Sequence, residues 1–257
     1  MNTPRPLILI SNDDGVDAPG IEFLARVASR HGDVVVVAPA SAQSGKSSAL
    51  TVNSPLMLKR QAGYAGCDAE VYSVNGTPVD CVKVALHAVV THRPALLLSG
   101  MNHGSNAAVN NIYSGTMGAA MEGCVVGIPS VGFSILSHSW EVDMKPTEQY
   151  VDRVIHYVLT HGLPDGICLN VNFPASPEVK GLKVTRAARG YWSEEYADYT
   201  TPDGKPFYWL TGNFINLEPE AADTDEYWLK RDYGSVVPIR PDQTALDMMS
   251  GLSSLSD

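Results

Sequence analysis

The chain of 257 residues has few cysteines and no long hydrophobic run. Its four cysteines, Cys67, Cys81, Cys124 and Cys168, are scattered and form no C-x-x-C pair. Neither a zinc site nor a disulfide framework is indicated, and buried thiols are expected. No stretch of about 18 apolar residues marks a membrane span, and the apolar run near the amino terminus is too short for a secretory signal. We therefore expect a cytoplasmic protein that does not bind membranes.

Basic residues are also scarce. Lysine and arginine number 18 against 28 acidic residues, which gives a formal net charge of −10. Non-specific binding to DNA, RNA or an anionic membrane needs a basic surface that releases counterions, so these partners are not expected. An anionic substrate would need a local site. The hydrophobic fraction of 44% allows a sizeable core, and the length is near the upper end for one domain.

Several motifs of nucleotide-binding and hydrolytic enzymes are absent. The segment "SGKSS" resembles the end of a phosphate-binding P-loop, but Ala40 stands where that pattern needs glycine, so Lys46 is expected to be an ordinary loop lysine. No G-x-G-x-x-G follows the first apolar run, and no G-x-S-x-G nucleophile elbow occurs. The histidines include no H-E-x-x-H pair, and His103 alone lies in a segment expected to carry function.

The sequence does contain a regular alternation of short apolar runs with amphipathic segments. Most of the runs lack polar alternation, which is typical of parallel strands buried on both faces. They cover residues 7–11, 33–40, 94–100, 129–135 and 166–174. Apolar stripes at helical spacing begin at Ile21 and Tyr150, and Thr77 followed by Pro78 is typical of a helix start. This rhythm predicts an α/β fold with a three-layer core.

The composition changes from about residue 186. The segments "RGYWSEEYADYTTPDGKPFYWL" and "DEYWLKRDYGSVVPIRP" are rich in aromatic and turn residues, which predicts β-hairpins. We therefore divide the chain into an α/β core, residues 1–185, and a C-terminal extension, residues 186–257. The extension is expected to be a small second domain or an oligomerisation arm. Aromatic residues such as Trp192 and Trp209 are favoured at interfaces, so a dimer is expected, although they would also serve to cover the protein's own core.

Polar segments follow three of the apolar runs, and in an open α/β sheet ligands bind beyond the carboxyl ends of the strands. The segments are 11–15, 41–48 and 99–106. In the first of them, the adjacent carboxylates of Asp13 and Asp14 repel each other and lose solvation, a cost that a bound divalent cation would offset. Oxygen ligands suit Mg²⁺ or Mn²⁺, and serine and asparagine side chains of the neighbouring loops would complete the shell.

An ordinary turn is the alternative interpretation of the "NDDG" segment. In that case Asp14 or Asp17 would cap a helix over residues 20–30. The local sequence fits both interpretations equally, and the convergence of the other two loops favours a site.

The segment "NNIYSGTMGAAMEG", residues 110–123, bears on the substrate. It places Ser114, Gly115 and Thr116 before a helix, where backbone N–H groups and hydroxyls form an anion site suited to phosphate. A simple serine N-cap is the alternative. A hard-metal site and a phosphate-sized anion site together predict metal-assisted phosphoester hydrolysis.

The chain also resembles a known family. The segments "ISNDDG", "VVVVAPASAQSGKSSALT", "VNGTPVDCV", "LLLSGMNHGSN", "YSGTMGAAMEG" and "LNVNFP" occur in the order and spacing of the SurE survival-protein family of nucleoside monophosphate phosphatases, over roughly residues 7–190. The resemblance implies a Rossmann-like core with a mostly parallel sheet and 5′-nucleotidase activity, with 3′-monophosphates and short polyphosphate as further candidate substrates. It also implies one Mg²⁺ or Mn²⁺ ion per subunit, and homodimers or homotetramers built with the C-terminal arm.

Matched position by position, the resemblance places the metal ligands on four residues: Asp13, Asp14, Ser44 and Asn102. It implies hydrolysis by a metal-activated water that Asp13 or Asp14, the two candidate catalytic residues, orients or deprotonates. Other residues of the same loops are expected to contact the substrate phosphate: Asn12, Asn106, Ser114, Gly115 and Thr116. The chain differs from the family pattern before Ser114, where it has Asn110 and Asn111 in place of a frequent acidic residue.

Two other classes of protein fit parts of the sequence. A non-enzymatic nucleotide-binding protein would use the same loops, and turnover alone separates it from an enzyme. A phosphatase of the haloacid dehalogenase type needs D-x-D-x-[TV] after its first strand. The segment "DTDE" at 223–226 follows no predicted strand and lacks that ending.

Overall fold

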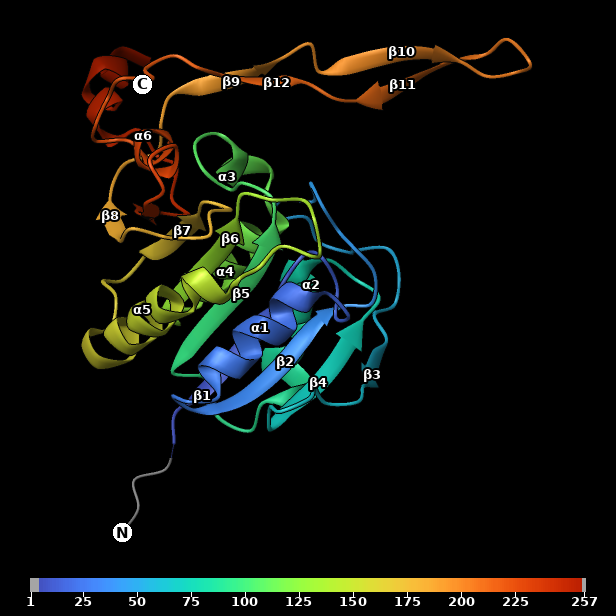
Figure 1. Ribbon diagram of the computed structural model, residues 1–257, viewed down its shortest axis with the longest axis vertical. Helices are drawn as coiled ribbons and strands as arrows, with labels where there is room; N and C mark the ends of the chain where they lie inside the picture. Colours follow the sequence, from blue (N-terminus) through green and yellow to red (C-terminus); the bar gives the residue numbers. More distant parts are fainter. Residues whose placement is uncertain (1–4, 256–257) are drawn as a thin grey trace.

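The computed structural model describes residues 5–255, and within them nine strands form one central sheet (Figure 1). The strand order is β3-β4-β2-β1-β5-β6-β7-β13-β8. The strands from β4 to β7 in this order are parallel: β4 (Ala69–Val74), β2 (Asp33–Pro39), β1 (Leu7–Ser11), β5 (Leu96–His103), β6 (Ser130–Ile135) and β7 (Cys168–Phe173). At the edges, β3 (Leu58–Arg60) and β13 (Gly234–Ile239) run antiparallel to their inner neighbours, and β8 (Leu182–Val184) pairs parallel with β13. The predicted α/β fold with a mostly parallel sheet is confirmed.

Helices cover both faces of this sheet (Figure 1). On one face, α1 (Pro19–Ala28) lies beside α5 (Glu148–His161). On the other face, α2 (Pro78–Val84) and its continuation as a π-helix, η1 (Ala85–Val89), lie beside α4 (Gly115–Val125). The short α3 (Asn110–Tyr113) and the 3-10 turn η2 (Lys145–Thr147) precede α4 and α5. Because the parallel strands are covered on both faces, their residues are apolar without alternation; every residue of β1, β6 and β7 is buried.

The helix ends follow the predicted signals. Thr77 and Asp80 form a capping box at the start of α2, in which Thr77 Oγ1 accepts from the Asp80 backbone N–H at 3.1 Å and Asp80 Oδ2 accepts from the Thr77 N–H at 2.9 Å. The last helix of the core, α5, ends at Gly162, whose φ of +69° is a conformation that favours glycine.

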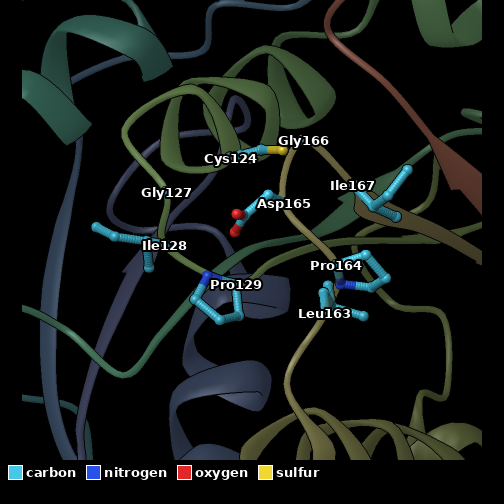
Figure 2. A pocket seen from close by; sticks show the side chains of 9 residues that line it. All are labelled: Cys124, Gly127, Ile128, Pro129, Leu163, Pro164, Asp165, Gly166 and Ile167. Atoms are coloured by element: carbon cyan, nitrogen blue, oxygen red, sulfur yellow. The ribbon is translucent and has the colours of Figure 1, made fainter.

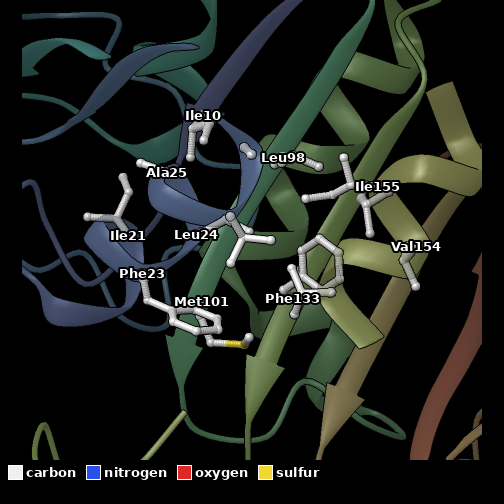
Figure 3. Close-up of a cluster of buried hydrophobic side chains, with 14 of the residues drawn as sticks. Ile10, Ile21, Phe23, Leu24, Ala25, Leu98, Met101, Phe133, Val154 and Ile155 are labelled. Carbon is white, nitrogen blue, oxygen red and sulfur yellow. The ribbon is translucent and has the colours of Figure 1, made fainter. Parts of the chain in front are cut away.

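The larger hydrophobic cluster fills the layer between the sheet and the α1–α5 face. Figure 3 shows Leu24 of α1, Phe133 of β6 and Ile155 of α5 in this layer, and all three are fully buried. Burial of each such side chain stabilises the fold by roughly 1.5–3 kcal/mol. A smaller cluster lies between the sheet and α2 and α4.

Of the two C-terminal segments predicted to form hairpins, the first does so, whereas the second, residues 225–241, forms a short helix and the central-sheet strand β13. β9 (Gly190–Ser193) pairs with β12 (Asn213–Asn216), and β10 (Tyr196–Thr200) pairs with β11 (Pro206–Leu210). Together they make an arm, residues 190–216, that extends away from the body (Figure 1), and every residue of β11 is exposed. The chain then returns through α6 (Asp225–Leu229) to β13 and ends in η3 (Leu246–Met248) and η4 (Ser250–Leu255). The predicted extension, residues 186–257, thus supplies both the arm and a strand of the central sheet.

The composition also led to expectations about membrane-spanning helices and about the cysteines. Among residues 5–255, no helix has the length and apolar character needed to cross a membrane. All four cysteines are free thiols; Cys81, Cys124 and Cys168 are buried as expected, and Cys67 is partly exposed.

A close approach between α1 and β5 gives a first prediction. A Cβ atom on Gly20 would lie 2.0 Å from the carbonyl oxygen of Met101, so the backbone has to shift to accept it. We expect Gly20→Ala to lower the free energy of unfolding by about 1–3 kcal/mol and the melting temperature by several degrees in a calorimetric scan. Gly251→Ala is the control, because a Cβ there has no neighbour within 4 Å. Equal melting temperatures for the two variants would contradict the close approach.

Candidate active site

The turn after β1 is closed by Asn12. Its side-chain Nδ2 donates to the Gly15 carbonyl at 2.9 Å, and its Oδ1 accepts from the Gly15 N–H at 3.2 Å. The N-cap position of helix α1 is Ala18, and no side chain caps the helix there. Neither Asp14 nor Asp17 therefore caps this helix, in contrast to the ordinary-turn interpretation. Asn12, which was expected to contact the substrate phosphate, uses both its amide atoms within the turn.

Asp13 lies directly against the start of α4. Its side chain is buried, with 3% of the residue exposed, and its Oδ1 accepts from Thr116 Oγ1 at 2.5 Å. A Cβ on Gly115 would lie 2.9 Å from Asp13 Cβ, so glycine is what allows the helix to begin this close to the acid. The backbone N–H groups at a helix start favour a negative charge beside them.

The burial of Asp13 has an electrostatic cost. Loss of solvation raises the pKa of its carboxyl group from 3.8 to about 6; the hydrogen bond from Thr116 opposes this shift, and repulsion by Asp14 adds to it. Within residues 5–255, Asp13 forms no ion pair, and the sole ion pair of Asp14 is with His103. The two acids therefore form a negative centre that no lysine or arginine of this part of the chain neutralises.

Asp14 is held by His103 at the end of β5. Its Oδ2 accepts from the His103 backbone N–H at 2.9 Å and from the ring Nδ1 at 2.8 Å. The ring is almost fully buried, and its Nε2 has no hydrogen-bond partner among the described residues. His103 thus fixes the orientation of one carboxylate. The sequence placed this histidine in a functional segment without indicating its role.

The side chain of Asn102 uses its amide nitrogen for hydrogen bonds within the loop. Its Nδ2 donates to the Gly104 carbonyl at 3.0 Å and to Asn106 Oδ1 at 3.3 Å, so both amide hydrogens are used. The pairing of β5 with β6 shifts register between Ser99 and Asn102, at the point where β5 reaches the edge of the sheet. The amide Oδ1 is therefore the atom that Asn102 offers to a ligand.

A buried network of asparagines holds this loop. The Asn106 backbone N–H donates to Asn172 Oδ1 at 2.9 Å, its Nδ2 donates to Ser134 Oγ at 2.5 Å, and its carbonyl accepts from Asn170 Nδ2 at 2.7 Å. Asn172 Nδ2 in turn donates to Asn170 Oδ1 at 2.8 Å. The side chain of Asn106, an expected phosphate contact, is thus used to position Asn102.

Asn170, Asn172 and Ser134 were not among the predicted site residues. A signal for two of them is present in the segment "LNVNF". Asn170 and Asn172 are two residues apart in β7, so they lie on the same face of a strand whose other residues are apolar. Two buried polar side chains on one face need hydrogen-bond partners nearby.

The third predicted loop, residues 41–48, reaches the same site. The Gln43 N–H donates to the Asp13 carbonyl at 2.7 Å, and Ser47 Oγ donates to the Ile112 carbonyl at 2.7 Å. Ser44 follows Gln43 in a turn and is exposed. The loops after β1, β2 and β5 are therefore joined to one another and to α3, as the sequence predicts for a sheet of this type.

Ser114 acts as the N-cap of α4. Its Oγ accepts from the Met117 N–H at 3.0 Å, which is the simpler of the two roles considered for it. Backbone N–H groups in the first turn of a helix have no acceptor within the helix. The start of α4 at Gly115 and Thr116 lies beside Asp13, and the anion site expected there stays a prediction.

Two cavities lie away from the acidic pair, Asp13 and Asp14. One of about 30 Å³, room for about one water molecule, is lined by residues 124–129 and 163–167 (Figure 2). A larger one, of about 330 Å³, is lined by residues of the segments 86–94 and 126–128. These segments precede β5, β6 and β7, at the opposite edge of the sheet from the two acids.

The "DTDE" segment has a structural role. Asp225 is fully buried, and its carboxylate accepts from the backbone N–H groups of Ala108, Ala188 and Glu226 at 2.8–2.9 Å. Asp223 is exposed and pairs with Arg186. Neither carboxylate is placed to act as the nucleophile of a haloacid dehalogenase-type phosphatase.

The buried acid predicts a pH-dependent stability of the metal-free protein. Because the pKa of Asp13 is about 6 in the folded protein and 3.8 ordinarily, the folded state loses stability as pH rises from 4 to 6. The loss reaches roughly 3 kcal/mol above pH 6. Asp13→Asn should remove it, so this variant should be more stable than the parent above pH 6 and equally stable below pH 4. Urea unfolding in chelator measures this.

The matched control is Asp165→Asn, which replaces an exposed carboxylate. Its stability relative to the parent should not change with pH over the same interval. A stability difference between Asp13→Asn and the parent that is the same at both pH values would contradict the assigned cost of burial.

Comparison with known proteins gives the family. Residues 8–194 match the family model for survival protein SurE. The 5′-nucleotidase SurE of Christiangramia forsetii is 46% identical over 258 residues, which covers 100% of this chain and 99% of that protein; the one of Phocaeicola vulgatus is 44% identical over 254 residues, 99% of this chain and 98% of that protein. The crystal structure of the SurE protein from Aquifex aeolicus superposes with a TM-score of 0.84 at 34% identity, covering 98% of this chain and 100% of that one. The chain belongs to the SurE family.

Proposed function

We propose that this SurE family member hydrolyses nucleoside 5′-monophosphates to nucleoside and phosphate with one divalent ion, Mg²⁺ or Mn²⁺, held in the site of each subunit. The chain is a 5′-nucleotidase, the activity that names its full-length relatives. The observation that carries the metal is the pair Asp13 and Asp14, two adjacent carboxylates of which one is buried and neither is neutralised by lysine or arginine in the described part of the chain.

The residues of the site fit a hard divalent ion. Asp13 and Asp14 offer carboxylate oxygens, Asn102 offers Oδ1, and Ser44 brings a hydroxyl on the loop that is bonded to Asp13. Within residues 5–255 no group of three or more His, Cys, Asp and Glu side chains is arranged to hold a metal ion, so the proposed ion depends on Asn102 and Ser44 in addition to the two carboxylates. Oxygen ligands of this kind suit Mg²⁺ and Mn²⁺. When bound, the ion supplies a Lewis acid that polarises the phosphate and activates water.

The protein's own residues prepare the site for this chemistry. Thr116 fixes Asp13, His103 fixes Asp14, and Asn106 fixes the amide of Asn102. Ligands held in this way lose little freedom on binding. Asp13 or Asp14 orients the attacking water and accepts its proton, which then passes to the 5′ oxygen of the departing nucleoside. The backbone N–H groups of Gly115 and Thr116 are proposed to bind the substrate phosphate.

Two finer points extend this proposal. Because recognition is centred on the phosphate, 3′-monophosphates and short polyphosphate are further candidate substrates.

A cytoplasmic location is supported by the four free thiols, which persist in a reducing compartment.

The proposal predicts strict metal dependence. Chelator-treated protein should release no phosphate above background from a panel of nucleoside 5′- and 3′-monophosphates. Mg²⁺ or Mn²⁺, added singly, should restore turnover, because each supplies the positive charge that balances the carboxylates of Asp13 and Asp14. Full turnover by metal-free protein would refute the metal's role, and binding of nucleotide without any phosphate release would favour a non-enzymatic binding protein.

We also propose that the arm, residues 190–216, joins subunits into a homodimer or homotetramer. Tyr196, Tyr208 and Trp209 are 63–66% exposed. They lie on β10 and β11, the part of the arm that extends away from the body in Figure 1. Large exposed aromatic groups mark interaction sites, and aromatic side chains are enriched in interfaces.

Light scattering at micromolar concentration should therefore give the mass of a dimer or tetramer. Replacing Tyr208 and Trp209 together by serine should lower the mass, because the substitution removes apolar area from the contact. Tyr157→Ser, on the exposed face of α5 and similarly exposed at 53%, is the matched control and should leave the mass unchanged. A monomeric parent protein would contradict the proposed assembly.

A further inference from the structure

One segment beside the site has no role in the function proposed so far. β6 ends at Ile135, and residues 136–144 follow it next to the end of β5. A Cβ on Gly104 would lie 2.9 Å from the ring of His138, and the ring of Trp140 lies 6.2 Å from that of His103, inclined by 36°. The segment therefore rests on the residues that directly follow Asn102.

Trp140 differs from Trp192 and Trp228 in its surroundings. The indole N–H of Trp192 donates to Asn110, and that of Trp228 donates to the Ala222 carbonyl. Trp140 lies beside His103 instead and keeps 55% of its surface exposed. A large aromatic surface exposed next to a substrate site is available for stacking against a planar ligand.

Trp140 is linked to the acidic pair through a single side chain, that of His103. His103 contacts both groups: its Nδ1 lies 2.8 Å from Asp14 Oδ2, and its ring centroid lies 6.2 Å from that of Trp140. In a nucleoside monophosphate, one ribose ring separates the phosphate from the base. A nucleotide whose phosphate is bound at the acidic pair therefore has the exposed indole of Trp140 as the neighbouring aromatic surface for its base.

We propose that Trp140 is the platform on which the base of the nucleoside monophosphate stacks. This inference rests on the proposed hydrolysis of nucleoside monophosphates. Every base has a π-face, so stacking tolerates all bases. Trp140 therefore selects nucleotides over phosphomonoesters that have no base, and it selects weakly among the bases.

The test compares two substrates that differ by the base, AMP and ribose 5-phosphate. Trp140→Ala should raise KM for AMP roughly tenfold, leave kcat for AMP near the parent value, and leave both constants for ribose 5-phosphate unchanged. Trp140→Phe keeps an aromatic face and should retain most of the preference for AMP. Trp140→Leu keeps apolar bulk without a π-face and should behave like the alanine variant, which also covers the case that Trp140→Ala does not fold.

A binding measurement gives a readout without turnover. Calorimetric titration with adenosine, which has no phosphate for the metal site, should show affinity falling roughly tenfold in Trp140→Ala and Trp140→Leu. Tyr157→Ala is the matched control, because Tyr157 is exposed to nearly the same extent, 53%, on α5. Its adenosine affinity and its KM for AMP should equal those of the parent.

Two results would overturn the inference. An equal rise in KM for AMP and ribose 5-phosphate would show that Trp140 maintains the structure of the site and does not contact the base. Unchanged kcat and KM for AMP in all Trp140 variants would show that the base binds elsewhere. Failure of the proposed function is distinguishable, because the parent protein with Mg²⁺ or Mn²⁺ would then release phosphate from neither substrate.

Discussion

Two adjacent carboxylates at the carboxyl end of β1 are the constraint on which the site depends. A buried ionised group is costly unless it is paired and hydrogen-bonded. Here Thr116 forms a hydrogen bond with Asp13 and His103 forms one with Asp14, yet no lysine or arginine within residues 5–255 neutralises either acid. The remaining negative charge makes a cation the natural partner of the site. The two acids also account for two neighbouring residues. The glycine at the start of α4 leaves room for Asp13, and the histidine at the end of β5 binds Asp14.

Much of the fold was predictable because burial on both faces leaves a local signature. The parallel strands are short apolar runs, and two of the helix ends are marked by the capping residues Thr77 and Gly162. Four strands of the central sheet, β3, β4, β8 and β13, were not predicted as such. β4 mixes exposed and buried residues, and β13 contains Pro238 and enters the sheet from beyond the hairpins. Such strands are defined by pairing with distant partners, which local propensity does not encode.

The candidate site was predictable to the extent that topology dictates it. Carboxyl ends of parallel strands meet at one edge, so Asp13, Asp14 and Asn102 were expected together, and their loops do meet there. The detailed hydrogen bonding was not predictable. Asn12 and Asn106 use their side chains to shape loops, since their partners depend on the fold of the turn and on the register between β6 and β7. Sequence spacing identifies which loops converge, and tertiary packing decides which atoms remain free for a ligand.

The most direct test is calorimetric titration of Mg²⁺ and Mn²⁺ into the parent protein and the Asp14→Asn variant, combined with turnover of a nucleoside 5′-monophosphate. Asn preserves the shape of the side chain and removes its charge. The account predicts one ion per subunit in the parent, and a folded Asp14→Asn variant whose metal affinity and turnover both fall by orders of magnitude. A folded variant that binds the ion and turns over substrate as the parent does would contradict it.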